Sequence, residues 1–96
     1  MRGDEFEWDA PKARSNLAKH GVSFESACLV FGDVFALDRL DASSDLGETR
    51  YVFTGMANDV LLTVVYTERP ERIRIISARK ATRHEQRAYY DSQTAG

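Results

Sequence analysis

Three segments with the composition of β-strands follow one another closely in the second half of the chain: Tyr51–Ala57, Val60–Tyr66 and Arg72–Arg79. Asn58 and Asp59 separate the first two, and this pair favours a tight hairpin because both residue types tolerate positive φ. A turn from Glu68 to Glu71, around Pro70, precedes the third segment. The middle segment is apolar on both faces, which is typical of a strand that is covered on both sides. The sequence therefore predicts a mostly antiparallel sheet with this segment near its centre.

Two helices are predicted before the sheet. Asp9 has the position of an N-cap, and Pro11 fits the first helical turn, where its missing N–H is not needed. This helix is expected to end at His20, because Gly21 supplies the left-handed residue that follows many helices. Its predicted inner face includes Ala13 and Leu17. A second helix should begin after the N-cap Ser23, and its apolar stripe comprises Phe24, Ala27, Cys28 and Phe31.

The remaining elements complete the pattern. Short strands are predicted at Phe6–Trp8 and Val34–Leu40, and a polar loop at Asp41–Glu48. Thr82 and Glu85 have the spacing of a capping box, which predicts a last helix through about Tyr90 and a frayed tail over 91–96. Residues 1–96 are therefore expected to form one α+β domain, with a mostly antiparallel sheet of four to five strands, two N-terminal helices and one C-terminal helix.

Several function classes lack support in the sequence. Cys28 is the only cysteine, and its helical spacing with Phe24 and Phe31 indicates a packed core residue. The sequence has no zinc-binding pattern, phosphate-binding glycine loop, dinucleotide fingerprint or nucleophile elbow, so neither a cofactor nor a metal is expected. A signal peptide and a run long enough to span a bilayer are also missing, and a cytoplasmic location is expected.

The charges are unevenly distributed along the chain. Residues 1–68 contain six Lys and Arg against twelve Asp and Glu, a net of −6, whereas residues 69–87 contain seven against two, a net of +5. The overall charge of −2 therefore conceals a basic segment, and it is the local field that attracts phosphate. The alternative interpretation is an ordinary solvated face.

Arginine is the residue type best suited to chemistry in this chain, because its guanidinium grips phosphate with two parallel hydrogen bonds and stays charged. In the segment Arg72–Arg79, simple alternation places Arg72 and Arg74 on one face and Arg79 on the other. The basic side chains on or beside the predicted sheet are Arg50, Arg69, Arg72, Arg74, Arg79, Lys80 and Arg83. If they converge, they can hold an RNA backbone and stabilise a crowded phosphorane. Alternatively, several form weak surface ion pairs with Glu48, Glu68 and Glu71.

Cleavage of RNA without a metal also requires a base for the ribose 2′-OH and an acid for the 5′ leaving oxygen. The candidates are His20, His84, Lys12, Lys19, Glu68 and a tyrosine. His20 is expected at the end of a helix, where the helix dipole favours a cation. Its alternative role is to hydrogen-bond the last carbonyl groups of that helix.

Three stretches of the sequence together resemble the BrnT toxin family. They are Phe6–Asp9 with Lys12, Asn16 and Lys19–Glu25; Glu48–Tyr51 with Gly55; and Arg72–Thr82. These stretches are spread over nearly the whole chain, and the first and last are long enough to be specific.

The resemblance implies a toxin of a bacterial type II toxin–antitoxin system, with a RelE-like fold, that cleaves RNA and arrests translation. The implied partner is a BrnA-like antitoxin, similar to ribbon-helix-helix proteins, in a heterotetramer of two toxins and two antitoxins that contacts operator DNA only through the antitoxin. The matching basic positions are Lys12, Lys19, His20, Arg50, Arg72, Arg74, Arg79 and Lys80. RelE-like sites lie on the sheet face and last helix, which fits Arg79 and Arg50 best.

Two hypotheses result. In the first, the chain is a metal-independent endoribonuclease in which Arg50, Arg72 and Arg79 clamp the phosphate while His20 or Lys12 transfers protons. The expected RNA-binding residues are then Arg69, Arg74, Lys19, Lys80 and Arg83. In the second, the same basic face belongs to a non-catalytic module that binds a protein or a nucleic acid.

Overall fold

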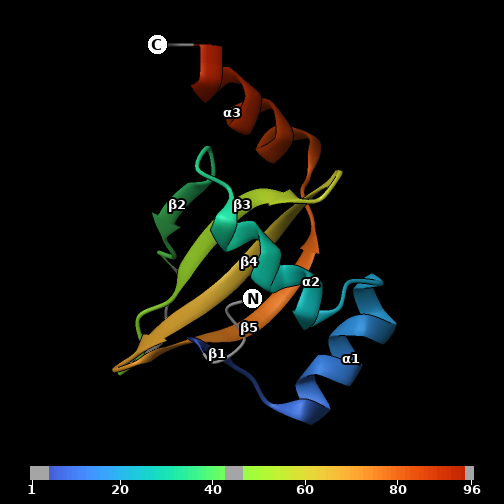
Figure 1. The fold of residues 1–96 in the computed structure, drawn as a ribbon, viewed down its shortest axis with the longest axis vertical. Coiled ribbons are helices and arrows are strands. Elements are labelled where there is room, and N and C mark those ends of the chain that lie inside the picture. The colour runs from blue at the N-terminus through green and yellow to red at the C-terminus, as the bar shows by residue number, and fades with distance from the viewer. Residues whose placement is uncertain (1–4, 43–46, 95–96) are drawn as a thin grey trace.

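The computed structural model describes residues 5–42 and 47–94 and shows an α+β fold, as predicted (Figure 1). The elements in chain order are β1 (Phe6–Glu7), α1 (Ala10–His20), α2 (Phe24–Leu29), the 3₁₀ helix η2 (Val30–Gly32), β2 (Leu37–Leu40), β3 (Tyr51–Ala57), β4 (Val60–Arg69), β5 (Arg72–Lys80) and α3 (Arg83–Thr94). The five strands form one sheet in the order β1-β5-β4-β3-β2. Only the pairing of β1 with β5 is parallel. The predicted central position of the strand that begins at Val60 is confirmed.

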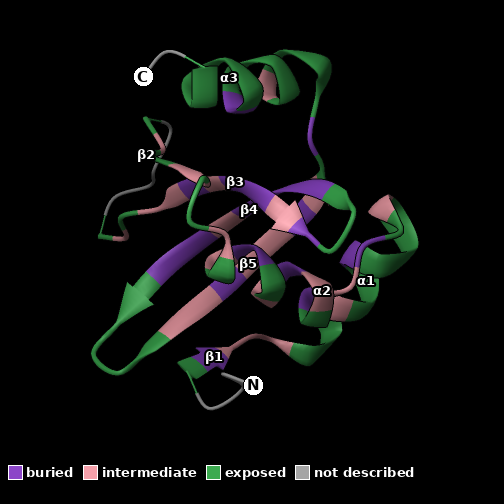
Figure 2. Ribbon diagram, turned by 45° about the horizontal axis from the view of Figure 1, so that its top comes forward, coloured by how far each residue is buried: buried purple, intermediate pink, exposed green. Residues whose placement is uncertain are grey.

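The two faces of the sheet differ in what covers them. The face that carries Leu62, Val64 and Tyr66 of β4 packs against α1 and α2, and we call it the core face. Its buried core consists of Phe6, Val22, Phe24, Ala27, Val30, Ala57, Leu62, Val64, Tyr66, Ile75 and Ala78. The opposite face, which carries Thr63, Thr67 and Arg69 of β4, is approached by α3 at one end, and we call it the arginine face. Figure 2 shows buried positions along the middle of the sheet and exposed ones at the β4–β5 turn.

Local sequence rules place both ends of α1 correctly. The Asp9 carboxylate accepts a hydrogen bond from the backbone N–H of Lys12, and Gly21 adopts a left-handed φ of 69° at the C-cap. The predicted inner face is only partly right: Ala13 packs against the core, but Leu17 is 50% exposed. Asn16 is buried instead, because its side-chain amide bonds backbone groups of Val22 and Ala78. The amide of Asn16 in α1 therefore provides hydrogen-bond partners for the backbone at the edge of β5.

The second helical segment also follows its signals. The Ser23 hydroxyl accepts from the Ser26 N–H, as expected of an N-cap, and η2 then continues from α2. A Cβ at Gly55 would lie 3.1 Å from the carbonyl oxygen of Val30, so glycine allows η2 to approach β3 closely. The Cys28 thiol packs against the core and bonds the Phe24 carbonyl, which confirms its predicted packing role.

The hairpins are as tight as predicted, or tighter. Asn58 adopts a positive φ of 58° between β3 and β4. At the other end of β4 the strands continue to Arg69 and resume at Arg72, so only two residues remain in the turn that was predicted to span Glu68–Glu71. The sheet is therefore longer at this end than the position of Pro70 suggests.

Two further predicted boundaries differ from the structure. The strand predicted at Val34–Leu40 begins only at Leu37, because the Asp33 carboxylate accepts a hydrogen bond from the Phe35 N–H and forms a turn. The last helix continues to Thr94 rather than Tyr90, so the expected frayed tail is helical over its described part. Ser92 and Gln93 donate to the carbonyl of Tyr89 and support this extension. The loop predicted at Asp41–Glu48 lies partly outside the described residues.

Candidate functional site

A β-bulge decides which face of the sheet carries Arg79. Ser77 pairs with Val65 and Ile75 pairs with the next residue of β4, Tyr66, so Ile76 is an extra residue in β5. The extra residue resets the alternation of side chains. The prediction that Arg79 points to the face opposite Arg72 and Arg74 is therefore wrong. The two consecutive isoleucines, which interrupt the alternating pattern, are the sequence signal that could have indicated the bulge.

Four arginines consequently share the arginine face. Register partners lie on the same face, and the pairs are Arg69 with Arg72, Arg74 with Thr67, and Arg79 with Thr63. Arg50 belongs to the same group, because the carboxylate of Glu48 bonds the guanidinium groups of both Arg50 and Arg69. The structure thus brings together five of the basic residues predicted from the sequence.

Most of these arginines already have a carboxylate partner. The N–O distances are 2.9 Å for Arg50–Glu48, 3.5 Å for Arg69–Glu48, 2.8 Å for Arg74–Glu7 and 2.7 Å for Arg79–Glu85. Ion pairing with Glu48, one of the alternatives read from the sequence, is thus observed for Arg50 and Arg69. Arg72 forms no salt bridge with any described residue.

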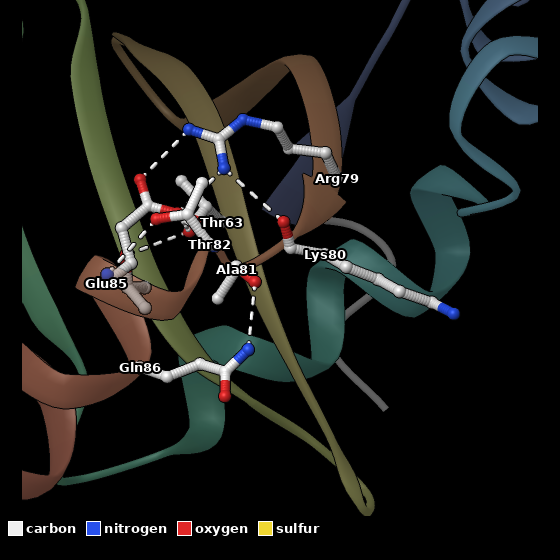
Figure 3. A network of polar contacts seen from close by, with 8 residues as sticks. Thr63, Arg79, Lys80, Ala81, Thr82, Glu85 and Gln86 are labelled. Carbon is white, nitrogen blue, oxygen red and sulfur yellow. Dashed lines mark hydrogen bonds and ion pairs between the residues drawn. The ribbon is translucent and has the colours of Figure 1, made fainter.

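The pair of Arg79 and Glu85 differs from the others because the carboxylate is held by further donors (Figure 3). Arg79 uses both terminal nitrogens, at 2.7 and 2.9 Å from the two Glu85 oxygens. The Oε1 atom of Glu85 also accepts from the Thr63 hydroxyl at 2.9 Å and from the Thr82 N–H at 2.8 Å. The predicted capping box is confirmed, since the Glu85 N–H donates in turn to the Thr82 hydroxyl. One carboxylate thus starts α3 and holds an arginine of β5.

A cleft of about 400 Å³ opens beside this network, between the sheet and the first turns of α3. Its lining residues are Leu37, Arg39, Val52, Thr54, Thr82, His84, Glu85 and Ala88. Arg39 was not identified from the sequence, because its place beside α3 depends on how that helix docks. His84 was only one of several proton-transfer candidates. The cleft is thus lined by a guanidinium, an imidazole and the Glu85 carboxylate that holds Arg79.

The other predicted site residues lie elsewhere. Lys12, Lys19 and His20 belong to α1, which packs on the side of the core face. Lys80 pairs with Leu62 and lines a separate cleft of about 460 Å³ beside Leu17; in Figure 3 its side chain points away from Glu85. Arg83 is the exposed first residue of α3. The structure therefore does not bring the proposed proton carriers His20 and Lys12 to the arginines.

Several ionisable groups near the sheet are held in one protonation state. Hydrogen bonding from Arg79 lowers the pKa of Glu85 to about 2, so this carboxylate is a poor proton acceptor near neutral pH. Burial, followed by the hydrogen bond donated to Asp33, raises the pKa of Tyr89 to about 12. Burial likewise raises the pKa of Tyr66 and brings the pKa of Cys28 to about 11. Within residues 5–42 and 47–94, no three His, Cys, Asp or Glu side chains gather as a metal ion would require.

The depressed pKa of Glu85 predicts a specific loss of stability in acid. Because the folded-state pKa is about 2 and the ordinary value is 4.5, the stabilisation is complete above pH 4.5 and is lost as the pH falls toward 2. Allowing for solvent screening of the partly exposed Arg79, we expect a loss of roughly 1–2 kcal/mol. Urea denaturation between pH 6 and pH 2.5 should show that the Glu85→Gln variant lacks this part of the pH dependence. The exposed Glu71→Gln serves as the matched control, and parallel curves for wild type and Glu85→Gln would contradict the prediction.

A small α+β domain that gathers arginines on one face of its sheet, beside a cleft with a histidine, has the features of a protein that acts on phosphodiesters. The comparison with protein families makes this class specific. Residues 8–85 match the family described as "Ribonuclease toxin, BrnT, of type II toxin-antitoxin system". The chain therefore belongs to the BrnT family of ribonuclease toxins. A comparison with curated proteins found no match. Among the described residues, no helix is long and apolar enough to cross a membrane.

Proposed function

We propose that this chain is a metal-independent endoribonuclease whose active site is the cleft between the arginine face and α3. The observation that carries the proposal is that Arg39 and His84 line one cleft together with Glu85, the carboxylate that holds Arg79. This arrangement supplies cationic groups for a phosphate and an imidazole for proton transfer. Membership of a ribonuclease toxin family supports it independently.

The proposed reaction is attack of a ribose 2′-oxygen on the adjacent phosphorus. The new oxygen–phosphorus bond forms as the bond from phosphorus to the 5′-oxygen breaks, which leaves a 2′,3′-cyclic phosphate and a 5′-hydroxyl group. The 2′-OH gives up its proton and the 5′-oxygen takes one up, so the site needs a group that exchanges protons near neutral pH. Imidazole does so, whereas a carboxylate as acidic as Glu85 does not. We therefore assign this role to His84 rather than to His20.

Arginines supply the remaining requirement, which is charge. Negative charge accumulates on the phosphoryl oxygens in the crowded transition state, and fixed guanidinium groups stabilise it without reorganising. Arg79 and Arg39 are assigned to this role. Arg50, Arg69, Arg72 and Arg74 continue along the same face and are assigned to binding the flanking RNA backbone. These residues need not release their carboxylates completely, because an exposed ion pair is weak and exchanges readily.

The binding partner and the cellular role are inferred from the family rather than from the geometry of the site. A type II toxin has a protein antitoxin. We further infer a BrnA-like ribbon-helix-helix antitoxin in a complex of two toxins and two antitoxins, arrest of translation through RNA cleavage, and action in the bacterial cytoplasm.

The test is cleavage of RNA by the purified protein, free of antitoxin, in the presence of EDTA. We expect cyclic-phosphate ends and unchanged rates after chelation. His84→Gln is expected to lower the rate by about tenfold or more, because one proton transfer loses its catalyst. His20→Gln is the matched control and should cleave normally. Tight binding of RNA without any product, from naked RNA and from translating ribosomes alike, would instead establish the non-catalytic module.

A further inference from the structure

Within the described part of the chain, the orientation of Arg79 is fixed by a network of hydrogen bonds around its carboxylate partner. The carboxylates that bond Arg50, Arg69 and Arg74 have no further hydrogen-bond donor among the described residues other than those arginines. Glu85, in contrast, is bound by Thr63 and Thr82 as well as by Arg79. The Thr63 hydroxyl is itself 3.1 Å from that of Thr54, and both threonines are buried. The acceptor for Arg79 is therefore anchored in the interior of the protein.

This network uses only part of the guanidinium group. Nη1 donates to Glu85 and, at 3.4 Å, to the Lys80 carbonyl, and Nη2 donates to the second Glu85 oxygen. A guanidinium has five N–H groups, and a planar pair of them lies along the Nε–Nη2 edge. Within the described part of the chain, Nε has no acceptor, and in Figure 3 this edge carries no contact with Lys80. Two parallel donors thus remain for one further oxyanion.

We propose that Glu85 is a positioning residue that fixes Arg79 so that its Nε–Nη2 edge clamps the scissile phosphate of RNA. The inference rests on the proposed ribonuclease function. It adds that the ligand of Arg79 is a phosphate group and that the Nε–Nη2 edge of the guanidinium binds it. A phosphate has oxygen atoms spaced to accept two parallel N–H bonds, so the free edge matches it. The carboxylate on the other edge keeps the guanidinium in one orientation before RNA arrives, which avoids an ordering cost in the transition state.

A competing role for Glu85 can be separated from this one. If Glu85 were instead a phosphate mimic that blocks Arg79, its removal would strengthen both RNA binding and cleavage. The four donors to Glu85, two of them outside Arg79, argue against such a displaceable group. A positioning role predicts opposite changes: Glu85→Gln should bind RNA as well as wild type or better, since a negative charge is removed, but should cleave more slowly by about 10- to 100-fold.

The decisive experiment combines kinetics with a double-mutant cycle. Affinity is measured with an RNA that carries a 2′-deoxy group at the cleavage site, and kcat with the cleavable RNA. We expect Glu85→Gln to lower kcat at undiminished affinity, and we expect the double variant with Arg79→Ala to be no slower than Arg79→Ala alone. Additive losses, or a rise in kcat for Glu85→Gln, would overturn the proposal. Urea denaturation of each variant separates loss of orientation from loss of folded protein.

A second readout does not depend on activity. In wild type, NMR of the arginine Nε–Hε groups should resolve one sharp Arg79 signal that shifts on addition of the 2′-deoxy RNA, whereas Glu85→Gln should give an averaged signal. If wild type cleaves no RNA, the ribonuclease proposal fails, yet a shift of the Arg79 signal would still identify its edge as a phosphate site. If wild type cleaves RNA and the Arg79 signal does not respond, the positioning inference fails while the ribonuclease proposal stands.

Discussion

Arg79→Ala is expected to slow RNA cleavage by about 10²–10³-fold, because it removes a fixed cationic donor from the developing phosphorane. Arg79 projects from β5 onto the arginine face, and Glu85 holds two of its nitrogens. Alanine cannot replace the parallel N–H donors or the charge. Arg79→Lys retains the charge but not the fork, so it should recover only a small part of the rate.

The measurement is the single-turnover rate of cleavage, with relief of growth arrest in cells as a second readout. Arg14→Ala is a matched control, since it removes the same charge from exposed surface of α1. Glu85 retains its bonds from Thr63 and Thr82 in the Arg79→Ala variant. The free energy of unfolding should therefore fall by only about 1–2 kcal/mol. Unchanged cleavage by a folded Arg79→Ala protein would remove this residue from the active site.

The parts of the fold that were predictable from the sequence are those decided by residues close together in the chain. Asp9 and Gly21 delimit α1, and Thr82 with Glu85 starts α3, because caps satisfy backbone groups within a few residues. The Asn58 turn is local in the same sense. Such signals predict the number and kind of elements, and hence the α+β class.

The arrangement of the candidate site depends on contacts between distant residues, and for these the sequence was insufficient. The bulge at Ile76 arises from the pairing of β5 with β4, and it alone moves Arg79 to the face of Arg72 and Arg74. Arg39 and His84 line the same cleft only because α3 docks beside β2 and β3. The alternation of residues along a single strand predicts neither the bulge nor the docking of α3.

The same limit applies to the proton carriers, for which local sequence signals favour His20 and Lys12 of α1. His20 lies at the end of a helix, where local rules favour a cation, but the helix packs on the core-face side. His84 carries no comparable local signal. Its neighbour Glu85 is predicted from the sequence only as the residue of a capping box that starts a helix. In the structure, Glu85 also holds Arg79, and His84 lines the cleft beside this pair.

Asn16→Ala is expected to destabilise the protein by about 3–5 kcal/mol, a larger loss of stability than Arg79→Ala should cause. The Asn16 amide nitrogen donates to the carbonyls of Val22 and Ala78, at 3.0 and 2.8 Å, and its oxygen accepts from the Ala78 N–H at 3.2 Å. The side chain thus continues the edge of β5 where β1 has ended. Alanine would leave three buried backbone groups without partners.

The expected shift of the unfolding midpoint is a decrease of roughly 15–25 °C for a domain of this size. Asn16→Asp should be no better tolerated, because its carboxylate faces two carbonyl oxygens that need a donor. The neighbouring Ser15→Ala, on the exposed side of α1, is the matched control and should unfold like wild type. Hydrogen exchange supplies a local readout, since the Ala78 amide should lose its protection in Asn16→Ala, which has no acceptor, but not in Asn16→Asp, which keeps one. A midpoint within a few degrees of wild type, with the Ala78 amide still protected, would show that α1 and β5 are joined by packing alone and that the amide bridge contributes little.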